Sequence, residues 1–462
     1  MMNTATNPPK RSLGIFALAM ISVAGIFSLR SLPMMAEYGL GSIFFYAIAA
    51  LIFFVPSALI CAELATAWPK TGGVYVWIRE AFGPGIGFLG IWMEWINTVV
   101  WFPIILSFIV ATLAFAINPQ LVQDKHFMLI SMLTIFWGIT WLNFLGIKIS
   151  SWFTGIGIIL GTLLPGLLII ILGFSWLLLG KTVHLSFSPS ALIPHFDLHQ
   201  DVFFTGVILS FAGMQIAGFH AQEAKNPQRN YPKAILIATI LIFIASVLGA
   251  LAIAIVIPQK QISLVAGLMQ TVSLFFNTFH LRWLLPVAAI FTVIGALSAL
   301  NTWIIGPSKG LLAMADQGDL PNIFKYRNKK NVPIAILLLQ AFIGTLLAFV
   351  FLFMPTVSSS YWILSALTMQ LTMIMYVLLF AASIKLRYSQ PNTPRAYKIP
   401  GNKLGIWIVA GLGILTAVLS IFIGFVPPTQ LHTGNIIFYE SFLIGSLAIL
   451  SLPAVFIAMR KQ

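Results

Sequence analysis

Long apolar segments, separated by short polar connections, make up most of the chain. A helix needs roughly 20 apolar residues to cross the hydrocarbon core of a bilayer. Strands of a membrane β-barrel would be about ten residues long and would alternate in polarity, whereas these segments are continuously apolar. The pattern predicts twelve transmembrane helices, at residues 12–37, 41–67, 85–117, 126–146, 150–178, 201–222, 232–257, 281–315, 333–354, 360–386, 404–427 and 435–459.

Helix-breaking residues lie near the middle of two of these predicted helices. Helix 1 contains Gly25, which can leave helical geometry without a steric penalty, and Pro33, which lacks a backbone donor. Helix 6 contains Gly213 and Gly218, with Gln215 between them. One break alone would indicate little, because glycine and proline are common in membrane helices. Two interrupted helices at corresponding positions of two repeats are typical of secondary transporters.

The spacing of the two breaks predicts how the chain is organised. Helices 1 and 6 are five helices apart, which fits two inverted repeats of five helices followed by two further helices. We therefore expect an all-α membrane protein in which one transporter domain spans residues 1–462. Its predicted parts are an N-terminal segment at 1–11, repeat one at 12–178, repeat two at 201–386 and the last two helices at 404–459.

The broken helices also predict a binding site. Non-helical backbone survives at membrane depth only where it is buried in protein or lines a cavity. Each break leaves free N–H groups at a half-helix N-terminus and free C=O groups at a C-terminus. Those ends attract a carboxylate and an ammonium group, respectively. A zwitterion such as an amino acid is the natural occupant of a site built from both.

Composition and charge agree with a protein that lies almost entirely in the membrane. The chain has 462 residues, of which 59% are hydrophobic and 8% charged, against about 25% charged residues in soluble domains. Of its 25 Lys and Arg residues, we assign 20 to the side of the N-terminus and Arg30 to helix 1. The four on the opposite side are Lys125, Lys181, Lys260 and Arg282.

This asymmetry predicts that both termini lie in the cytoplasm, in a multi-pass protein of the plasma (bacterial inner) membrane. The asymmetry also explains the net charge of +14 without a nucleic-acid partner. The single cysteine, Cys61, excludes an intrachain disulfide. No nucleophile, metal cluster or carboxylate pair typical of an enzyme stands out, so we expect no catalytic residues, no metal and no cofactor.

Four strings resemble signatures of the amino acid–polyamine–organocation transporter superfamily. CAELATAWPKTGGVYVWIREAFGPGIGF (61–88) follows helix 2, EAKNPQRNYPKA (223–234) follows helix 6, and WIIGPSKGLLAMADQGDLPNIF (303–324) covers helix 8 and its loop. RAYKIPG (395–401), after helix 10, resembles the branch of glutamate/γ-aminobutyrate antiporters. The resemblance implies a LeuT-like fold with broken helices 1 and 6, and amino acid or amine transport by alternating access, frequently as exchange.

The resemblance also implies which residues contact the substrate. The candidates are Val23, Ala24, Gly25 and Ile26 in helix 1, Phe211, Ala212, Gly213, Met214 and Gln215 in helix 6, Trp303 in helix 8 and Tyr376 in helix 10.

The chain departs from the antiporter branch at several points. Glutamate/γ-aminobutyrate antiporters carry Glu where this chain has Gln215 and Ala299, and their C-terminal tail closes the cytoplasmic mouth, whereas this sequence ends at Gln462. We therefore expect no acid-resistance exchange of glutamate for γ-aminobutyrate. Some superfamily members use a lysine in helix 5 for proton coupling, and Gly161 occupies the equivalent region here.

Few ionisable residues lie inside the predicted helices, and each is a functional candidate. Arg30 could pair with a substrate carboxylate or an acidic pathway group, or its side chain could extend to the outer lipid headgroups. Glu94 could face Arg30, hold a substrate ammonium group or carry a coupling proton, or it could be a structural hydrogen-bonded residue. Asn97 and Trp101 follow Glu94 at helical spacing and extend a polar and aromatic face.

Other polar residues have weaker assignments. Glu63 is expected to pair with Arg79 or Lys70 near the N-terminal side of the membrane. Only some of Thr368, Gln370, Thr372 and Tyr376 can line a pathway, because they do not share one helix face. Ser298, Asn301 and Thr302 in helix 8 are either sodium ligands or, more simply, groups that form hydrogen bonds between helices.

The resulting functional prediction is secondary active transport of amino acids, by exchange or linked to protons. The alternatives are transport of another organic amine or cation, and sodium-coupled symport. A major-facilitator architecture is disfavoured by the short connection between helices 6 and 7, and a channel or scaffold does not need paired helix breaks. The sequence leaves open the substrate's identity, the coupling ion and the oligomeric state.

Overall fold

The computed structural model describes residues 13–70, 72–144, 157–193, 202–216, 224–316, 318, 320–330 and 332–459. Helices dominate these ranges, and the described residues form no β-sheet, only isolated bridges between Leu13 and Ala224 and between Arg327 and Pro333. The predicted all-α class is therefore confirmed. Gly218, Glu223 and the basic residues Lys10, Arg11 and Lys148 lie outside the described residues.

Eleven described helical segments are long and apolar enough to cross a membrane, and the shorter Phe203–Ile216 lies where helix 6 was predicted. The membrane-spanning elements are α1 (Ile15–Ile26) with α2 (Leu32–Ala36), α3 (Gly41–Ala49) with α4 (Val55–Ala67), α6 (Pro84–Ile117), α7 (Lys125–Phe144), α9 (Leu164–Leu178), α11 (Phe203–Ser210), α12 (Pro227–Val256), α14 (Leu285–Asp316), α15 (Ile334–Ala348) with α16 (Val350–Phe353), α17 (Val357–Ser389), α18 (Asn402–Ile423) and α19 (Ile436–Met459).

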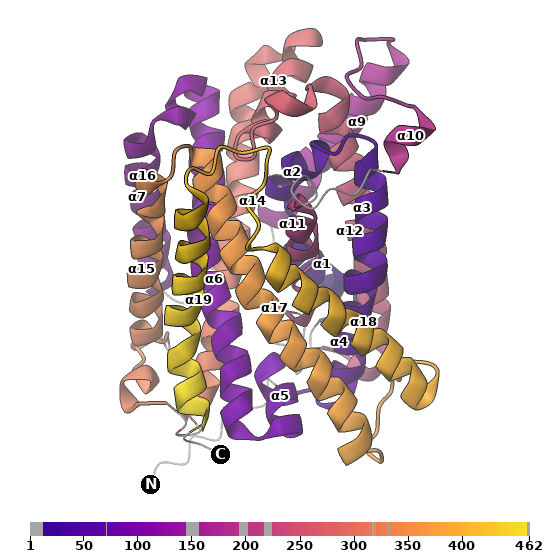
Figure 1. Ribbon diagram of the computed structural model, residues 1–462, viewed down its shortest axis with the longest axis vertical. Coiled ribbons are helices and arrows are strands. Elements are labelled where there is room, and N and C mark those ends of the chain that lie inside the picture. The colour runs from indigo at the N-terminus through magenta and orange to yellow at the C-terminus, as the bar shows by residue number, and fades with distance from the viewer. Residues whose placement is uncertain are drawn as a thin grey trace.

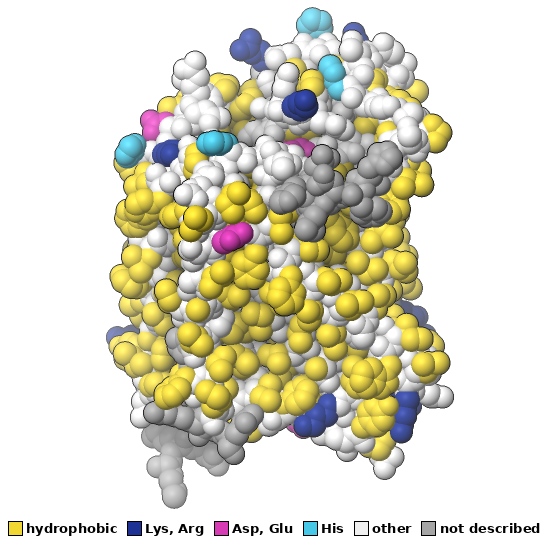
Figure 2. All heavy atoms as spheres, in the orientation of Figure 1, with side chains coloured by type: hydrophobic (Ala, Val, Ile, Leu, Met, Phe, Trp, Pro, Cys, Tyr) yellow, Lys and Arg dark blue, Asp and Glu magenta, His cyan; other side chains and the backbone are white. Residues whose placement is uncertain are grey.

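Three shorter helices are not among the spans, α5 (Val74–Phe82), α10 (Pro189–Leu192) and α13 (Gly267–Thr278). Figure 1 shows α5 at the lower end of the molecule, and α10 and α13 at the upper end. Apolar side chains cover the middle of the face seen in Figure 2, and most of its charged side chains lie toward the two ends. This distribution matches a protein whose middle section is surrounded by lipid.

The centre of the bundle is formed by α6 and α17, which pack against each other and are the most buried spans. The helix α14 packs on the other side of α6. The final span, α19, is the least buried. Helices 3, 8 and 10 of the predicted order therefore surround the interior into which the broken helices project.

Helices 5 and 8 approach so closely that their backbones touch. A Cβ atom on Gly161 would overlap the backbone of Gly295 on α14, and a Cβ on Gly295 would overlap Gly161. Interiors are packed at the density of organic crystals, so no side chain fits between these two positions. The contact excludes a lysine at position 161 for a steric reason, which the sequence alone did not indicate.

Both predicted helix breaks are present. The first helix ends at Ile26, and Phe27 and Ser28 adopt extended backbone conformations before the chain turns into α2. The break is therefore two to three residues beyond Gly25, which remains helical. Pro33 lies in the first turn of α2, where a missing N–H costs nothing, so this proline begins the second half-helix.

The sixth helix breaks at the predicted glycine. The helix α11 ends at Ser210, and Gly213 has a φ of +132°, a conformation that side-chain-bearing residues rarely adopt. A single turn at residues 214–216 follows. The glycine thus permits the chain to leave the helix axis at membrane depth.

Candidate substrate site

The two breaks meet inside the bundle. A Cβ atom on Gly213 would lie 2.9 Å from Cγ1 of Ile26 and 3.2 Å from the carbonyl oxygen of Gly25. A Cβ atom on Gly25 would lie 2.9 Å from Cδ1 of Ile216. At Gly213, glycine is needed both for its φ of +132° and for this close approach to the backbone of Gly25, and the expected juxtaposition of the two weak points is observed.

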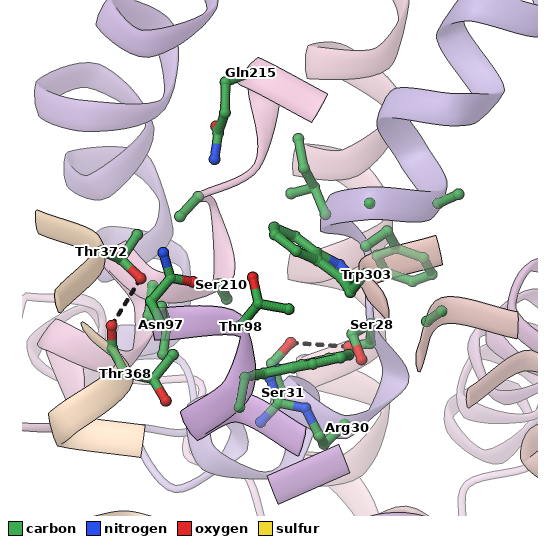
Figure 3. A pocket seen from close by; sticks show the side chains of 18 residues that line it. Ser28, Arg30, Ser31, Asn97, Thr98, Ser210, Gln215, Trp303, Thr368 and Thr372 are labelled. Atoms are coloured by element: carbon green, nitrogen blue, oxygen red, sulfur yellow. Dashed lines mark hydrogen bonds between the residues drawn. The ribbon is translucent and has the colours of Figure 1, made fainter. Parts of the chain in front are cut away.

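A pocket of about 60 Å³ opens beside this crossing, with room on the order of five water molecules. Figure 3 shows its lining, with Gln215 and Arg30 toward opposite ends and Trp303 between them. Nine of the predicted residues line the pocket: Ala24, Gly25, Ile26, Arg30, Asn97, Trp101, Ala212, Gln215 and Trp303. The remaining lining residues are Phe27, Ser28, Ser31, Thr98, Leu209, Ser210, Ala299, Thr368 and Thr372.

A chain of hydrogen bonds runs from the break in helix 6 to helix 3. The backbone N–H of Gly213 donates to the hydroxyl of Tyr376 at 2.9 Å, and this hydroxyl donates to Oε1 of Gln215 at 2.6 Å. Gln215 Nε2 then donates to Oε1 of Glu94 at 2.9 Å. Helices 3, 6 and 10 are thereby joined through side chains that the sequence had singled out separately.

Glu94 lies directly behind the pocket wall. Its side chain is fully buried, and Nδ2 of Asn97 lies 3.4 Å from its second carboxylate oxygen. Within the described residues no lysine or arginine forms an ion pair with Glu94. Because Gln215 and Asn97 both line the pocket and both donate to Glu94, a ligand that contacts either amide would also affect the carboxyl group.

Arg30 is held by aromatic side chains. Its Nη1 donates to the hydroxyl of Tyr361 at 2.5 Å, and its guanidinium lies 5.5 Å from the ring centre of Tyr361 and 5.8 Å from that of Trp101. Trp101 also packs against Trp303, with 6.0 Å between ring centres. Arg30 is only 7% exposed, so its side chain neither extends to the lipid headgroups nor pairs with Glu94.

Comparison with known proteins now identifies the class of this chain. A family model of amino acid permeases matches residues 13–448. The chain belongs to the amino acid permease family. An uncharacterised transporter of Legionella pneumophila is 45% identical to this permease over 96% of the chain and 95% of the relative.

Two further relatives have more specific names. A glutamate/γ-aminobutyrate antiporter of Lactococcus lactis is 30% identical over 95% of the permease and 89% of the relative. A probable agmatine/putrescine antiporter of the same species is 24% identical over 90% and 89%, respectively. The predicted resemblance to the antiporter branch is therefore confirmed at the level of the family.

Several predicted site residues of this permease do not line the pocket, namely Val23, Phe211, Gly213, Met214, Glu94 and Tyr376. Gly213, Glu94 and Tyr376 instead form the hydrogen-bonded support behind it. Phe211 stacks almost parallel on Phe54 of the span that follows helix 1, with 4.4 Å between ring centres. Its burial anchors the break of helix 6 to the core.

Helix 10 divides its polar residues between two faces. Thr368 and Thr372, one turn apart, line the pocket, while Gln370 donates to the carbonyl of Ile421 on α18. On α14, the hydroxyls of Ser298 and Thr302 donate to carbonyls four residues earlier in the same helix. Both bonds lie within α14, and the choice between sodium ligands and interhelical hydrogen bonds stays a prediction.

Glu63 has other partners than those predicted. Both of its carboxylate oxygens accept from Arg387 at 2.5 Å, and Nε of Arg395 lies 3.2 Å away. Lys70 pairs instead with Glu80. The expected pairing of Glu63 with Lys70 or Arg79 is wrong because the signature that contains Arg395 folds back over the end of α4.

This buried cluster of one carboxylate and two guanidiniums, the Glu63 cluster, lies where α4 and α17 end, at the end of the bundle opposite α13 (Figure 1). The backbone N–H of Ile399 also donates to Glu63, at 2.9 Å. Burial lowers the pKa of Arg395, and the carboxylate of Glu63 opposes that change. The cluster joins two of the four signature strings, which are more than 300 residues apart.

Proposed function

We propose that this permease is a secondary amino acid transporter that works by alternating access and exchanges one substrate molecule for another. The observation that carries the proposal is the pocket at the crossing of the two broken helices, lined by both breaks and by helices 3, 8 and 10. Half-helix ends, amide groups and hydroxyl groups converge there, as recognition of a zwitterion requires. The antiporter names of the Lactococcus relatives support exchange.

Glu94 is assigned a coupling role in this proposal. A substrate group that hydrogen-bonds Gln215 competes with the bonds that Gln215 makes to Tyr376 and Glu94. Occupancy of the pocket is thereby linked to the carboxyl group and to the break of helix 6. The carboxyl group can then respond by binding a proton or a substrate ammonium group.

We further propose that both termini face the cytoplasm. The support is the positive-inside rule, together with the position of the basic residues around α5 and in the 395–403 segment at one end of the bundle. Cys61 is buried, so a new surface cysteine can be labelled selectively. Lys403→Cys in intact cells should resist a membrane-impermeant maleimide, and Lys260→Cys should react; the opposite pattern would reverse the topology.

The transport proposal is tested by counterflow into liposomes. Purified protein is reconstituted, the liposomes are loaded with one of the twenty amino acids or a derived amine, and entry of the labelled compound is measured. We expect accumulation with at least one amino acid, above protein-free liposomes. Folded protein that accumulates none of them would refute the proposal. Repeating the assay across pH and with or without sodium separates exchange from proton and sodium coupling.

A further inference from the structure

The pocket has one charged wall residue among the described side chains that line it. Arg30 carries that charge, and neither Asp nor Glu lines the cavity. Glu94 lies behind Gln215 and Asn97 and does not line the pocket. The pocket therefore presents a positive charge to a ligand.

Arg30 has an unused donor. Tyr361 accepts from Nη1, while the buried Nε has no hydrogen-bond partner among the described residues. Buried donors of charged groups almost always have a partner, because an unsatisfied one loses its hydration without compensation. Arg30 itself borders the cavity, so a ligand in the pocket lies next to this side chain.

The same chain shows what such a donor binds. Arg387 holds the Glu63 carboxylate through Nε and Nη2, with one oxygen on each at 2.5 Å. In Arg30 the contact with Tyr361 engages Nη1, and Nε has no hydrogen-bond partner among the described residues. Planar guanidinium edges match carboxylates in a two-point contact. The rings of Trp101 and Tyr361 hold the guanidinium of Arg30 in a fixed orientation.

We propose that Arg30 binds a carboxylate of the transported molecule and thereby restricts the pocket to amino acids, excluding amines that have lost the carboxylate. This inference rests on the proposed transport function. A carboxylate neutralises the buried guanidinium, whereas a di- or polyamine adds positive charge beside it without an acidic wall residue to compensate. The opposite end, at Gln215, remains available for the ammonium group (Figure 3).

The test compares amino acids with the amines formed from them by loss of the carboxylate. The wild-type protein should exchange the amino acid and reject its amine. Arg30→Gln should raise KM for the amino acid by at least about tenfold, the effect of losing a charged hydrogen bond, and should strengthen inhibition by the amine, because the repelling charge is gone. Arg282→Gln, which removes an exposed arginine outside the pocket, should leave both values unchanged.

A purely structural role of Arg30 would lower folded yield or rate without changing the ratio of amino acid to amine. If Arg30→Gln fails to fold, Arg30→Lys is tested instead, because it retains the charge but not the two-point contact. An increase in KM for the amino acid in Arg30→Lys would support the proposal in the same way. Two results would overturn the Arg30 proposal alone. One is an unchanged KM in the folded Arg30 variant while the wild-type protein exchanges the amino acid. The other is equal use of the amine and the amino acid by the wild-type protein. Wild-type protein that exchanges no amino acid overturns the transport proposal.

Discussion

Replacing Tyr376 by phenylalanine removes a single oxygen atom from the support of the pocket. That oxygen accepts from the N–H of Gly213 and donates to Oε1 of Gln215. Both partners are buried, so water cannot replace the lost hydroxyl without rearrangement. The break of helix 6 would lose its direct connection to helix 10.

The cost can be estimated from these two bonds. Leaving a buried polar group unsatisfied costs about 1–3 kcal/mol, so the two together cost about 2–6 kcal/mol. The lower value alone corresponds to about a 30-fold change in an equilibrium constant. A matched control is Tyr46→Phe, since Tyr46 is also fully buried but its hydroxyl has no hydrogen-bond partner among the described residues.

The assay is counterflow together with thermal unfolding of the purified variants. Tyr376→Phe should reduce exchange by at least about 30-fold, or lower the unfolding temperature where the folded state cannot rearrange. Tyr46→Phe should match wild type in both measurements. If the two variants behave alike, the hydrogen-bond chain does not support the pocket, and the link from Gly213 to Glu94 is refuted.

Two further substitutions test the packing and the ion pairs. Gly161→Ala should sharply lower folded yield and unfolding temperature, because its Cβ would overlap the backbone of Gly295. The control Gly138→Ala should be neutral, because no atom lies within 4 Å of the added Cβ. Equal behaviour of the two variants would contradict the close contact of helices 5 and 8. Glu63→Gln should destabilise by about 3–5 kcal/mol, because it leaves two buried arginines without their carboxylate, and thermal unfolding should show this. Glu80→Gln, at a partly exposed pair, should cost at most about 1 kcal/mol, and a similar loss in both variants would contradict the reasoning.

Membrane burial explains why the helices could be predicted from sequence. Lipid offers no hydrogen bonds, so backbone that faces lipid must be helical, and the long apolar segments of the sequence show where these helices lie. The break in helix 6 was also predictable, because a φ of +132° at Gly213 requires glycine. Glycine at position 25 serves a different need. The side chain of Ile216 packs against it, and the helix continues to Ile26.

Contacts between distant residues were not predictable. Arg30 and Tyr361 are 331 positions apart, and Glu63 and Arg387 are 324 positions apart. No local sequence pattern predicts a contact between residues so far apart. Two signals were nevertheless present near the break. Ser28 and Ser31 flank Arg30 in the segment between the half-helices, and polar residues at a break in an apolar span indicate a cavity.

The most direct test of the account is protection of the pocket by substrate. Ser28→Cys places a thiol in the lining of the broken first helix, and the native Cys61 is buried and gives little background. The rate of its modification by a small thiol reagent is measured with and without a saturating concentration of the exchanged amino acid. We predict that the amino acid slows modification at least about tenfold. An unchanged rate, in a variant that still exchanges the amino acid, would contradict the placement of the substrate between the two broken helices.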